Sequence, residues 1–385
     1  MLNVGDAFSQ RLIVLSSYLR NKQEAAKSSQ MHVFIDILTP KQCMLFAELS
    51  EQLRSEGHKV SETTREYREV NQLLKMKGIE ARVVGRHGGA ALKDKLEASA
   101  QRTLELASIV AESQPDVVVS FASPEMSRVA FGLHLPHVCL NDSPHSEAVA
   151  RLTVPFVSLL LTPKFVPKTA WTKFGIVPSR IVQYNAIDPW AWLKDFKPDE
   201  KVLRRLGLVA SQPIVVFRAE ESFASYLLGR TSKNPTWTPL LENMLESNLN
   251  LQAVVLPRYE SQIDFLTEKF GQHAVICRST VDAPSLLSYT SVFVGAGGTM
   301  TAEAALLGVP TFSCYPGKPF LIEDYLVKKG LIIRETNCMR IREKVLKTLD
   351  NIETVRKTQA MKARKLTNTF EDPIKAIVKA IEQMS

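Results

Sequence analysis

A glycine turn followed by a helix start is the clearest candidate for chemistry in this chain. It lies within VFVGAGGTMTAEAALLGVPTFSCYPG, residues 292–317. Gly297 and Gly298 leave the backbone open, and Thr299 begins a predicted helix whose free N–H groups and dipole favour a bound anion. Glu303 lies one turn into that helix, where its carboxylate can accept hydrogen bonds from paired sugar hydroxyls. The alternative is a tight strand–helix turn with a solvated glutamate, which many α/β proteins contain.

The densest polar cluster is the segment NDSPHSE at residues 141–147. A carboxylate beside an imidazole can act as a general base and the group that orients it. Asp142 or His145 is therefore a candidate to take the proton of an attacking hydroxyl, with Glu147 as support. The alternative is a helix cap in which Glu147 belongs to a capping box. A cap needs no histidine, and the cluster is longer than a cap requires.

Two arginines end predicted strands in the second half of the chain, where ligands of parallel α/β sheets bind. Arg218 follows the apolar run IVVF, and Arg258 follows LQAVVLP. Two guanidinium groups can hold a diphosphate by bidentate hydrogen bonds. Either arginine taken alone is equally typical of a protein surface.

Polar residues also follow the predicted strands of the first half. Lys41 is a candidate acceptor contact, although the Thr-Pro before it also forms an ordinary helix start. Arg86 and His87 can contact an acceptor phosphate or simply form an exposed turn. Glu125 is a candidate catalytic carboxylate or a first-turn glutamate that the helix dipole favours.

The composition is that of an ordinary globular enzyme. The 385 residues suffice for two domains, and 45% hydrophobic and 23% charged residues are typical of such chains. A net charge of +8 favours anionic partners, but no zinc finger, RNA-recognition signature or basic heptad region points to nucleic acid. The five cysteines contain no CxxC pair, so neither a zinc site nor a disulfide framework is predicted. We expect no metal and no cofactor.

Hydropathy predicts a cytoplasmic protein without a membrane span. No apolar run reaches the roughly 18 residues that a spanning helix needs. Residues 11–18 lack the cleavage site of a signal peptide. Basic loops of the first half offer peripheral docking on an anionic membrane, with Leu73, Leu74 and Met76 as apolar contacts. The alternative is that these three side chains face the core.

Strands and helices alternate along the chain, which predicts βαβ units and parallel sheets. Residues 1–30 are expected to form a peripheral or disordered extension. Residues 31–186 form the first predicted domain and residues 210–368 the second. A linker at residues 187–209 joins them, and residues 369–385 contain a final helix.

The glycine segment resembles a known nucleotide-sugar site. Gly-Gly-x-x-x-x-Glu-Ala followed by Gly-Val-Pro is similar to the C-terminal domain of GT-B glycosyltransferases, above all the N-acetylglucosaminyltransferase that makes the peptidoglycan lipid precursor. UDP-N-acetylglucosamine 2-epimerases share that architecture. From Met31 onward the chain resembles an uncharacterised, largely archaeal family of predicted GT-B glycosyltransferases. The motifs that carry this likeness are IDILTPKQ, GHKV, VVGRHGG, FASPEMSRVAFGLHLP and NDSPHSEAVARLT.

The resemblance implies an α/β chain of GT-B fold, with two Rossmann-like, doubly wound parallel-sheet domains facing a cleft. The final helix is then expected to pack back on the first domain. A nucleotide-diphosphate sugar is the implied donor, and its sugar hydroxyls would meet Glu323. The acceptor is unidentified, with a lipid-linked molecule or a polysaccharide as options. No carboxylate pair stands out for a divalent metal, which agrees with metal-independent GT-B transfer.

The sequence departs from these relatives in three places. The loop after the first strand has neither the glycines nor the catalytic histidine of related transferases. EESFASY, residues 220–226, stands where they carry a glycine-rich loop, and their glutamine pair is absent. Two alternatives therefore stay open: a nucleotide-sugar 2-epimerase or hydrolase that uses Glu125 and Glu147, and a non-catalytic nucleotide-sugar-binding protein.

Overall fold

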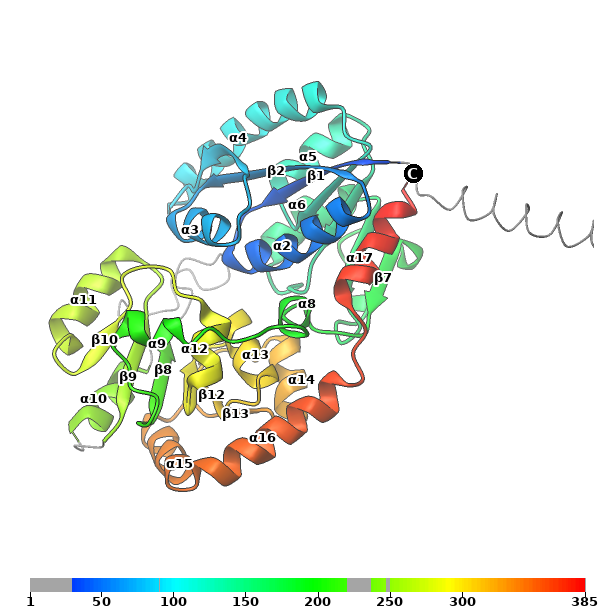
Figure 1. The fold of residues 1–385 in the computed structure, drawn as a ribbon. Coiled ribbons are helices and arrows are strands. Elements are labelled where there is room, and N and C mark those ends of the chain that lie inside the picture. Colours follow the sequence, from blue (N-terminus) through cyan, green and yellow to red (C-terminus); the bar gives the residue numbers. More distant parts are fainter. Residues whose placement is uncertain (1–29, 90, 220–236, 247–249, 385) are drawn as a thin grey trace, which may run out of the picture.

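The chain forms two α/β domains, each built on one parallel sheet (Figure 1). The computed structural model describes residues 30–384 except 90, 220–236 and 247–249. The predicted N-terminal extension and the EESFASY segment therefore lie outside the described residues, apart from Gln30. The predicted fold class, with two doubly wound parallel sheets, is confirmed.

The first domain contains a seven-stranded sheet in the order β3-β2-β1-β4-β5-β6-β7. Its strands are β1 (His32–Ile37), β2 (Lys59–Glu66), β3 (Arg82–Arg86), β4 (Val117–Phe121), β5 (His137–Leu140), β6 (Leu159–Pro163) and β7 (Ile181–Tyr184). Its helices are α2 (Pro40–Ser55), α3 (Arg68–Met76), α4 (Leu92–Ser113), α5 (Pro124–Gly132), α6 (Glu147–Thr153) and α7 (Thr169–Thr172), with 3₁₀ turns at Val154–Phe156 and Pro178–Arg180.

The second domain contains a six-stranded sheet in the order β10-β9-β8-β11-β12-β13. Its strands are β8 (Ile214–Arg218), β9 (Gln252–Leu256), β10 (Ala274–Ile276), β11 (Val292–Gly295), β12 (Thr311–Ser313) and β13 (Ile332–Arg334). Its helices are α9 (Lys201–Leu206), α10 (Thr238–Glu246), α11 (Glu260–Phe270), α12 (Ala283–Tyr289), α13 (Thr299–Leu306), α14 (Leu321–Lys328), α15 (Cys338–Asp350) and α16 (Ile352–Thr367).

The apolar runs of the sequence became the central strands because helices cover both sheet faces. Strands β1, β4 and β8 are buried along their whole length. Helix α2 begins at Pro40, a residue suited to a first turn, and buries Leu45, Leu49 and Leu53 at helical spacing against the sheet. Because the strands of each sheet are parallel, all of them end at the same edge of that sheet, and the loops after them lie together there.

Two segments connect the domains. The first contains the short helix α8 (Trp190–Leu193), and the second leads into α17 (Pro373–Glu382). Helix α17 packs on α2 of the first domain, with Ile374, Ile377 and Ile381 in the same hydrophobic core as Leu49 (Figure 1). The chain thus leaves the first domain after β7 and returns to it with its last helix.

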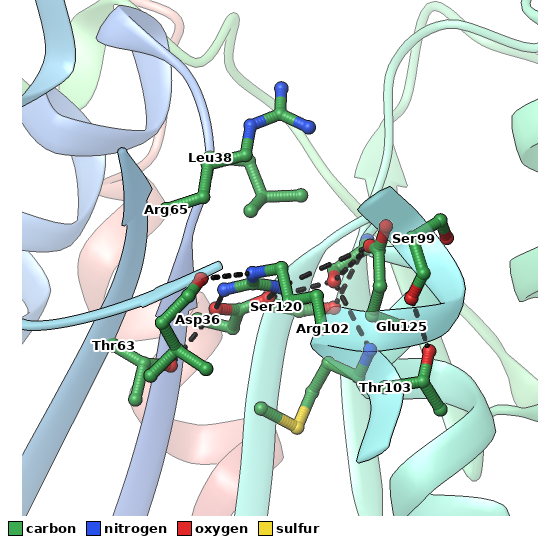
Figure 2. Close-up of polar contacts among 12 residues, drawn as sticks. Asp36, Leu38, Thr63, Arg65, Ser99, Arg102, Thr103, Ser120 and Glu125 are labelled. Atoms are coloured by element: carbon green, nitrogen blue, oxygen red, sulfur yellow. Dashed lines mark hydrogen bonds and ion pairs between the residues drawn. The ribbon is translucent and has the colours of Figure 1, made fainter. Parts of the chain in front are cut away.

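A charged network lies inside the first domain between β1 and α4 (Figure 2). Arg102 of α4 makes a bidentate contact with Asp36 of β1, at 2.6 and 3.0 Å. Thr63 and Ser123 donate hydroxyl hydrogen bonds to the same carboxylate, at 2.9 and 2.7 Å. Burial raises the pKa of Asp36, but Arg102 outweighs this effect and lowers the pKa below its usual value. The pair is therefore an ionised contact that ties α4 to the sheet.

The sequence missed one strand, and the structure decides where three apolar side chains of α3 lie. Strand β6 was not predicted, since its apolar run LLL continues from an apolar helix and carries no turn signal of its own. Leu73 and Leu74 are buried in the first-domain core, whereas Met76 is 48% exposed. Two of the three side chains proposed as membrane contacts therefore face the core. Within the described residues, the structure contains no helix long and apolar enough to cross a bilayer.

Candidate functional site

A cavity of about 600 Å³ lies between the two domains. The first domain lines it with the start of α2 and with α3, which follow β1 and β2. The second domain lines it with the residues after β8, β9 and β10 and with the starts of α12 and α13. Trp192 and Phe196 of the connecting segment complete the wall. Both sheets thus present their carboxyl-end loops to this cavity, as parallel α/β sheets do at ligand sites.

The glycine turn directly precedes Thr299, which lines this cavity. Gly297 and Gly298 have φ values of +78° and +87°, which side-chain-bearing residues rarely adopt. A Cβ on Gly297 would lie 3.3 Å from Glu323 Oε2, and one on Gly298 would lie 3.7 Å from Arg258 Nη2. The start of α13 therefore has open backbone amides beside a guanidinium group, which is the arrangement that suits a phosphate.

Glu303 lies inside the cavity wall and is only 5% exposed. Its Oε1 accepts a 2.8 Å hydrogen bond from the indole Nε1 of Trp192. Burial raises the pKa of Glu303 to about 7, although the Trp192 hydrogen bond opposes that shift. The carboxylate of Glu303 is thus poised to change charge near neutral pH.

Arg218 and Arg258 both reach the cavity from the second domain. Arg258 Nε donates to the carbonyl of Ala219 at 2.9 Å, and Arg218 Nη1 donates to the carbonyl of Pro257 at 2.9 Å. Arg218 Nη2 also donates to Glu69 of the first domain at 3.0 Å. A carboxylate of the protein itself therefore already contacts the arginine that we predicted to hold a diphosphate.

Helix α3 makes two further contacts with the second domain. Arg68 donates to the carbonyl of Arg278 at 2.6 Å. Gln72 Oε1 accepts from the backbone N–H and the hydroxyl of Thr280, at 3.1 and 2.6 Å. Together with Glu69, these side chains make α3 one wall of the cavity and a clasp between the two domains.

His145 of the first domain contacts a residue that borders the glycine turn. Its ring stacks on Phe320 of the second domain, with centroids 4.1 Å apart, and Phe320 also borders Gly297. Burial lowers the pKa of His145, with Asp142 opposing and Lys41 reinforcing the shift. A neutral imidazole is therefore the form expected at neutral pH.

Asp142 is held as an ion rather than as a free base. Lys41 Nζ lies 2.6 Å from Asp142 and 2.5 Å from Asp188, and the Tyr184 hydroxyl donates to Asp188. Burial raises the pKa of Asp142, but the Lys41 ammonium outweighs burial and lowers it. Burial lowers the pKa of Lys41, but the two carboxylates raise it above its usual value. Lys41 thus links the start of α2 to the segments that carry Asp142 and Asp188. It also lines the cavity.

Glu323 presents one buried, unbonded oxygen beside Gly297. Its Oε1 accepts from the Ser313 hydroxyl, while its Oε2 has no hydrogen-bond partner among the described residues. Burial raises the pKa of Glu323, and the Ser313 hydrogen bond opposes the rise. Glu323 is not among the lining residues of the cavity, and its contact with a sugar hydroxyl stays a prediction.

The other predicted residues lie apart from this site. Glu147 is exposed at the start of α6 and pairs with Arg151 at 2.6 Å. Glu125 is buried beside Ser123 and Arg102, at 3.4 and 3.9 Å. The structure therefore does not bring Glu125 and Glu147 together as a carboxylate pair.

The predicted acceptor residues Arg86 and His87 lie at the end of β3. Arg86 is exposed, and His87 stacks on Tyr67, a cavity residue, with centroids 5.2 Å apart. Burial, assisted by the charges of Arg65 and Lys95, lowers the pKa of His87 to about 4. His87 is thus an uncharged ring at the border of the cavity.

One group of side chains in the described residues has the spacing of a metal site. It consists of Glu56, His58 and Glu382, at the ends of α2 and α17. His58 Nδ1 accepts the N–H of Met31 at 3.2 Å, so Nε2 carries the proton and has no lone pair for a metal. This group also lies outside the interdomain cavity.

A family model described as "Protein of unknown function (DUF354)" matches residues 31–384. The chain belongs to this family. The "Uncharacterized protein MJ0665" of Methanocaldococcus jannaschii is 30% identical over 316 residues, which cover 81% of this chain and 89% of that protein. The family therefore spans both domains and the cavity between them.

Solved structures with the same fold show that both domains are arranged as in GT-B proteins. The UDP-GlcNAc 2-epimerase from Neisseria meningitidis, bound to UDP-GlcNAc, has a TM-score of 0.71 at 14% identity over 92% of this chain and 99% of that chain. The spinosyn forosaminyltransferase SpnP has a TM-score of 0.59 at 16% identity over 92% and 99%. These likenesses establish the GT-B fold of this DUF354 chain.

Sequence reasoning missed three residues of the site: Glu69, Asp188 and Trp192. Glu69 and Asp188 contact partners 149 and 147 positions away, so no local pattern links them to Arg218 or Lys41. Trp192 stood in the predicted linker, where paired tryptophans already signal burial. The burial of Trp192 was thus predictable, but its partner Glu303, 111 positions away, was not.

Proposed function

We propose that the protein transfers a sugar from a nucleotide-diphosphate sugar to an acceptor hydroxyl, without a metal. The observation that carries this proposal is the convergence of three features on one cavity: the open start of α13, the buried Glu303 one turn along it, and Arg258 beside Gly298. In this arrangement the phosphates lie on Gly297, Gly298 and Thr299, and the ribose hydroxyls bind Glu303.

The first domain supplies the proposed base. His145 stacks on Phe320, which borders Gly297, so it is the first-domain base nearest to the proposed phosphate site. Asp142 orients the positive charge of Lys41 toward this region rather than taking the proton. Arg218, Arg258 and the dipole of α13 offset the charge of the leaving diphosphate.

Direct binding tests the proposal. Isothermal titration calorimetry with UDP, GDP, TDP and their sugars should detect binding of one nucleotide class, beginning with UDP because structural neighbours were crystallised with UDP or UDP sugars. Release of free sugar or of an epimer without an acceptor would favour the epimerase or hydrolase alternative. Failure of every nucleotide to bind at millimolar concentration would refute the proposal.

Nucleotide affinity should depend on pH through Glu303. Ribose hydroxyls donate to a carboxylate better than to a carboxylic acid, and the pKa of Glu303 is about 7. Affinity for UDP-glucose, whose diphosphate does not titrate here, should rise from pH 6 to pH 8. The affinity for UDP-glucose can change by at most about tenfold per pH unit, because one proton is linked to binding. Glu303→Gln should weaken binding and flatten the profile, whereas Glu268→Gln, on the exposed face of α11, should leave both unchanged. A pH-independent wild-type affinity would contradict the assignment.

Removal of the Glu69 carboxylate should tighten UDP binding. Glu69 occupies one side of Arg218 that a donor phosphate needs, so UDP must replace it. Glu69→Gln should lower the Kd of UDP about tenfold, since hydrogen bonds to charged groups contribute roughly 1.5–3 kcal/mol and this contact is partly screened. Uridine, which lacks phosphate, should bind both proteins equally, and the exposed Glu80→Gln is the control. Weaker UDP binding would instead show that Glu69 positions Arg218 for the donor.

A further inference from the structure

Arg65 is a partly buried cation that has no counterion among the described residues. It belongs to β2, and its Nε is buried without a hydrogen-bond partner. Within the part of the chain that the structure describes, no residue forms an ion pair or a hydrogen bond with its guanidinium group. Its neighbour Arg102 differs sharply, since Arg102 has a bidentate carboxylate partner and donates to the carbonyl of Val84 at 2.9 Å.

The strand places Arg65 near the carboxyl end of the first-domain sheet, although Arg65 itself is not a lining residue of the interdomain cavity. Thr63, two residues earlier, points to Asp36, so Arg65 lies on the same sheet face and one step nearer the carboxyl end. Figure 2 shows its guanidinium group pointing away from the Asp36–Arg102 pair. Tyr67, two residues further along the chain, already lines the interdomain cavity.

The surroundings of Arg65 do not neutralise it. Burial lowers the pKa of Arg65, Glu125 and more weakly Asp36 oppose this shift, and Arg102 reinforces it. Glu125 is the carboxylate that acts on it most, but the Glu125 Oε2 lies toward Ser123 and Arg102. His87, the ring nearby, is uncharged, and Lys95 adds another positive charge. A desolvated cation without a hydrogen-bonded partner destabilises the folded protein, and a bound anion would offset that effect.

We propose that Arg65 binds an anionic group, a phosphate or a carboxylate, of the acceptor. This inference rests on the proposed function, because the first domain is the side on which the acceptor hydroxyl must meet His145. A planar guanidinium group with free donors matches both oxyanions in a bidentate manner.

Arg65 is the next-to-last residue of β2, and the loop with His145 follows β5, three strands away in the order β2-β1-β4-β5. At about 4.8 Å per strand, the ends of these two strands are roughly 14 Å apart. The anionic group that Arg65 binds is therefore separate from the hydroxyl that attacks the donor.

The test compares wild type with Arg65→Met, which keeps the length of the side chain and removes its charge. Inorganic phosphate is titrated into UDP-saturated protein, so that the diphosphate subsite is already filled, and binding is followed by calorimetry and thermal melting. We expect phosphate to bind wild type at millimolar concentration and to bind Arg65→Met at least tenfold more weakly. In phosphate-free buffer, Arg65→Met should melt higher than wild type, because an unpaired buried charge has been removed.

Two controls distinguish phosphate bound at Arg65 from phosphate bound elsewhere on the protein. Arg128→Met, at an exposed arginine of α5, should bind phosphate as wild type does. UDP affinity should be equal in all three proteins. A failure of UDP to bind wild type refutes the donor site, but the phosphate comparison between wild type and Arg65→Met still tests Arg65. Equal phosphate binding by wild type and Arg65→Met overturns the inference, and so does a lower melting temperature of Arg65→Met, which would make Arg65 a structural residue.

Three further probes identify the source of the anion. Glycerol phosphate represents a soluble phosphate ester, glucuronate a sugar carboxylate, and dodecyl phosphate in neutral micelles a lipid phosphate. Whichever probe loses the most affinity in Arg65→Met names the chemical class of the acceptor. If none of the three distinguishes wild type from Arg65→Met, the inference is wrong.

Discussion

His145→Ala should reduce sugar transfer by about 10²- to 10⁴-fold, the range that general-base catalysis contributes in enzymes. The imidazole of His145 is neutral because burial lowers its pKa, and it stacks on Phe320, which borders the glycine turn. Its removal leaves the phosphate and ribose contacts of the second domain untouched. Transfer of labelled sugar from the donor identified by binding into an extract of the source cells measures the loss, and UDP affinity should change by less than about threefold.

The matched control for this experiment is Glu147→Gln. Glu147 belongs to the same polar segment, but it is exposed and pairs with Arg151 on its own helix. Its variant should therefore transfer sugar at the wild-type rate. An equal loss of activity in both variants would show that any substitution in this segment disturbs the site. Full activity of His145→Ala would show that His145 is not the base. Loss of UDP binding in His145→Ala would assign it to the donor site instead.

Arg102→Met should lower the free energy of unfolding by about 3–5 kcal/mol, the usual cost of breaking a buried ion pair from one side. Asp36 then stays buried with only hydroxyl donors, and the carbonyl of Val84 loses its partner. Urea denaturation followed by circular dichroism measures the change. Arg128→Met, an exposed substitution on the neighbouring helix, should cost less than about 0.5 kcal/mol.

The stability lost in Arg102→Met should be larger at high pH than at low pH. The pKa of Asp36 is lowered in the folded wild type, so its stabilising effect is present above the unfolded value and fades as pH falls through the folded value. In Arg102→Met that pKa rises, and protonation then relieves the unpaired charge. The difference between wild type and Arg102→Met should therefore be larger at pH 8 than at pH 5. A loss below about 1 kcal/mol at pH 8 would contradict the role of Arg102 as the buried counterion of Asp36.

Local patterns predicted the fold well because burial on both faces of a parallel sheet leaves a strong signal. Apolar runs at β1, β4 and β8 marked the strands, and Gly298 with Thr299 marked the start of α13. β6 was missed because its apolar residues continue those of the preceding segment. The GT-B arrangement came from the resemblance rather than from any periodicity.

Only the part of the candidate site that lies within one continuous sequence motif could be predicted. Gly297, Gly298 and Glu303 lie within seven residues of one another, so a local pattern describes them. The contact between Arg218 and Glu69 depends on how two separately folded domains meet. Glu147 shows the converse: its place in a dense polar segment suggested chemistry, yet the first turn of α6 directs it to solvent.

Because α17 belongs to the core that β1 begins, the second domain is an insertion within the first. During synthesis, β8 to α16 leave the exit tunnel of the ribosome before α17 does. The first domain is complete only when α17 follows with Ile374, Ile377 and Ile381. Domains usually fold in the order of their synthesis, and here the domain that begins first is finished last. Until then the apolar face of α2 lacks its cover, which makes the helix Pro373–Glu382 decisive for how the nascent chain avoids aggregation.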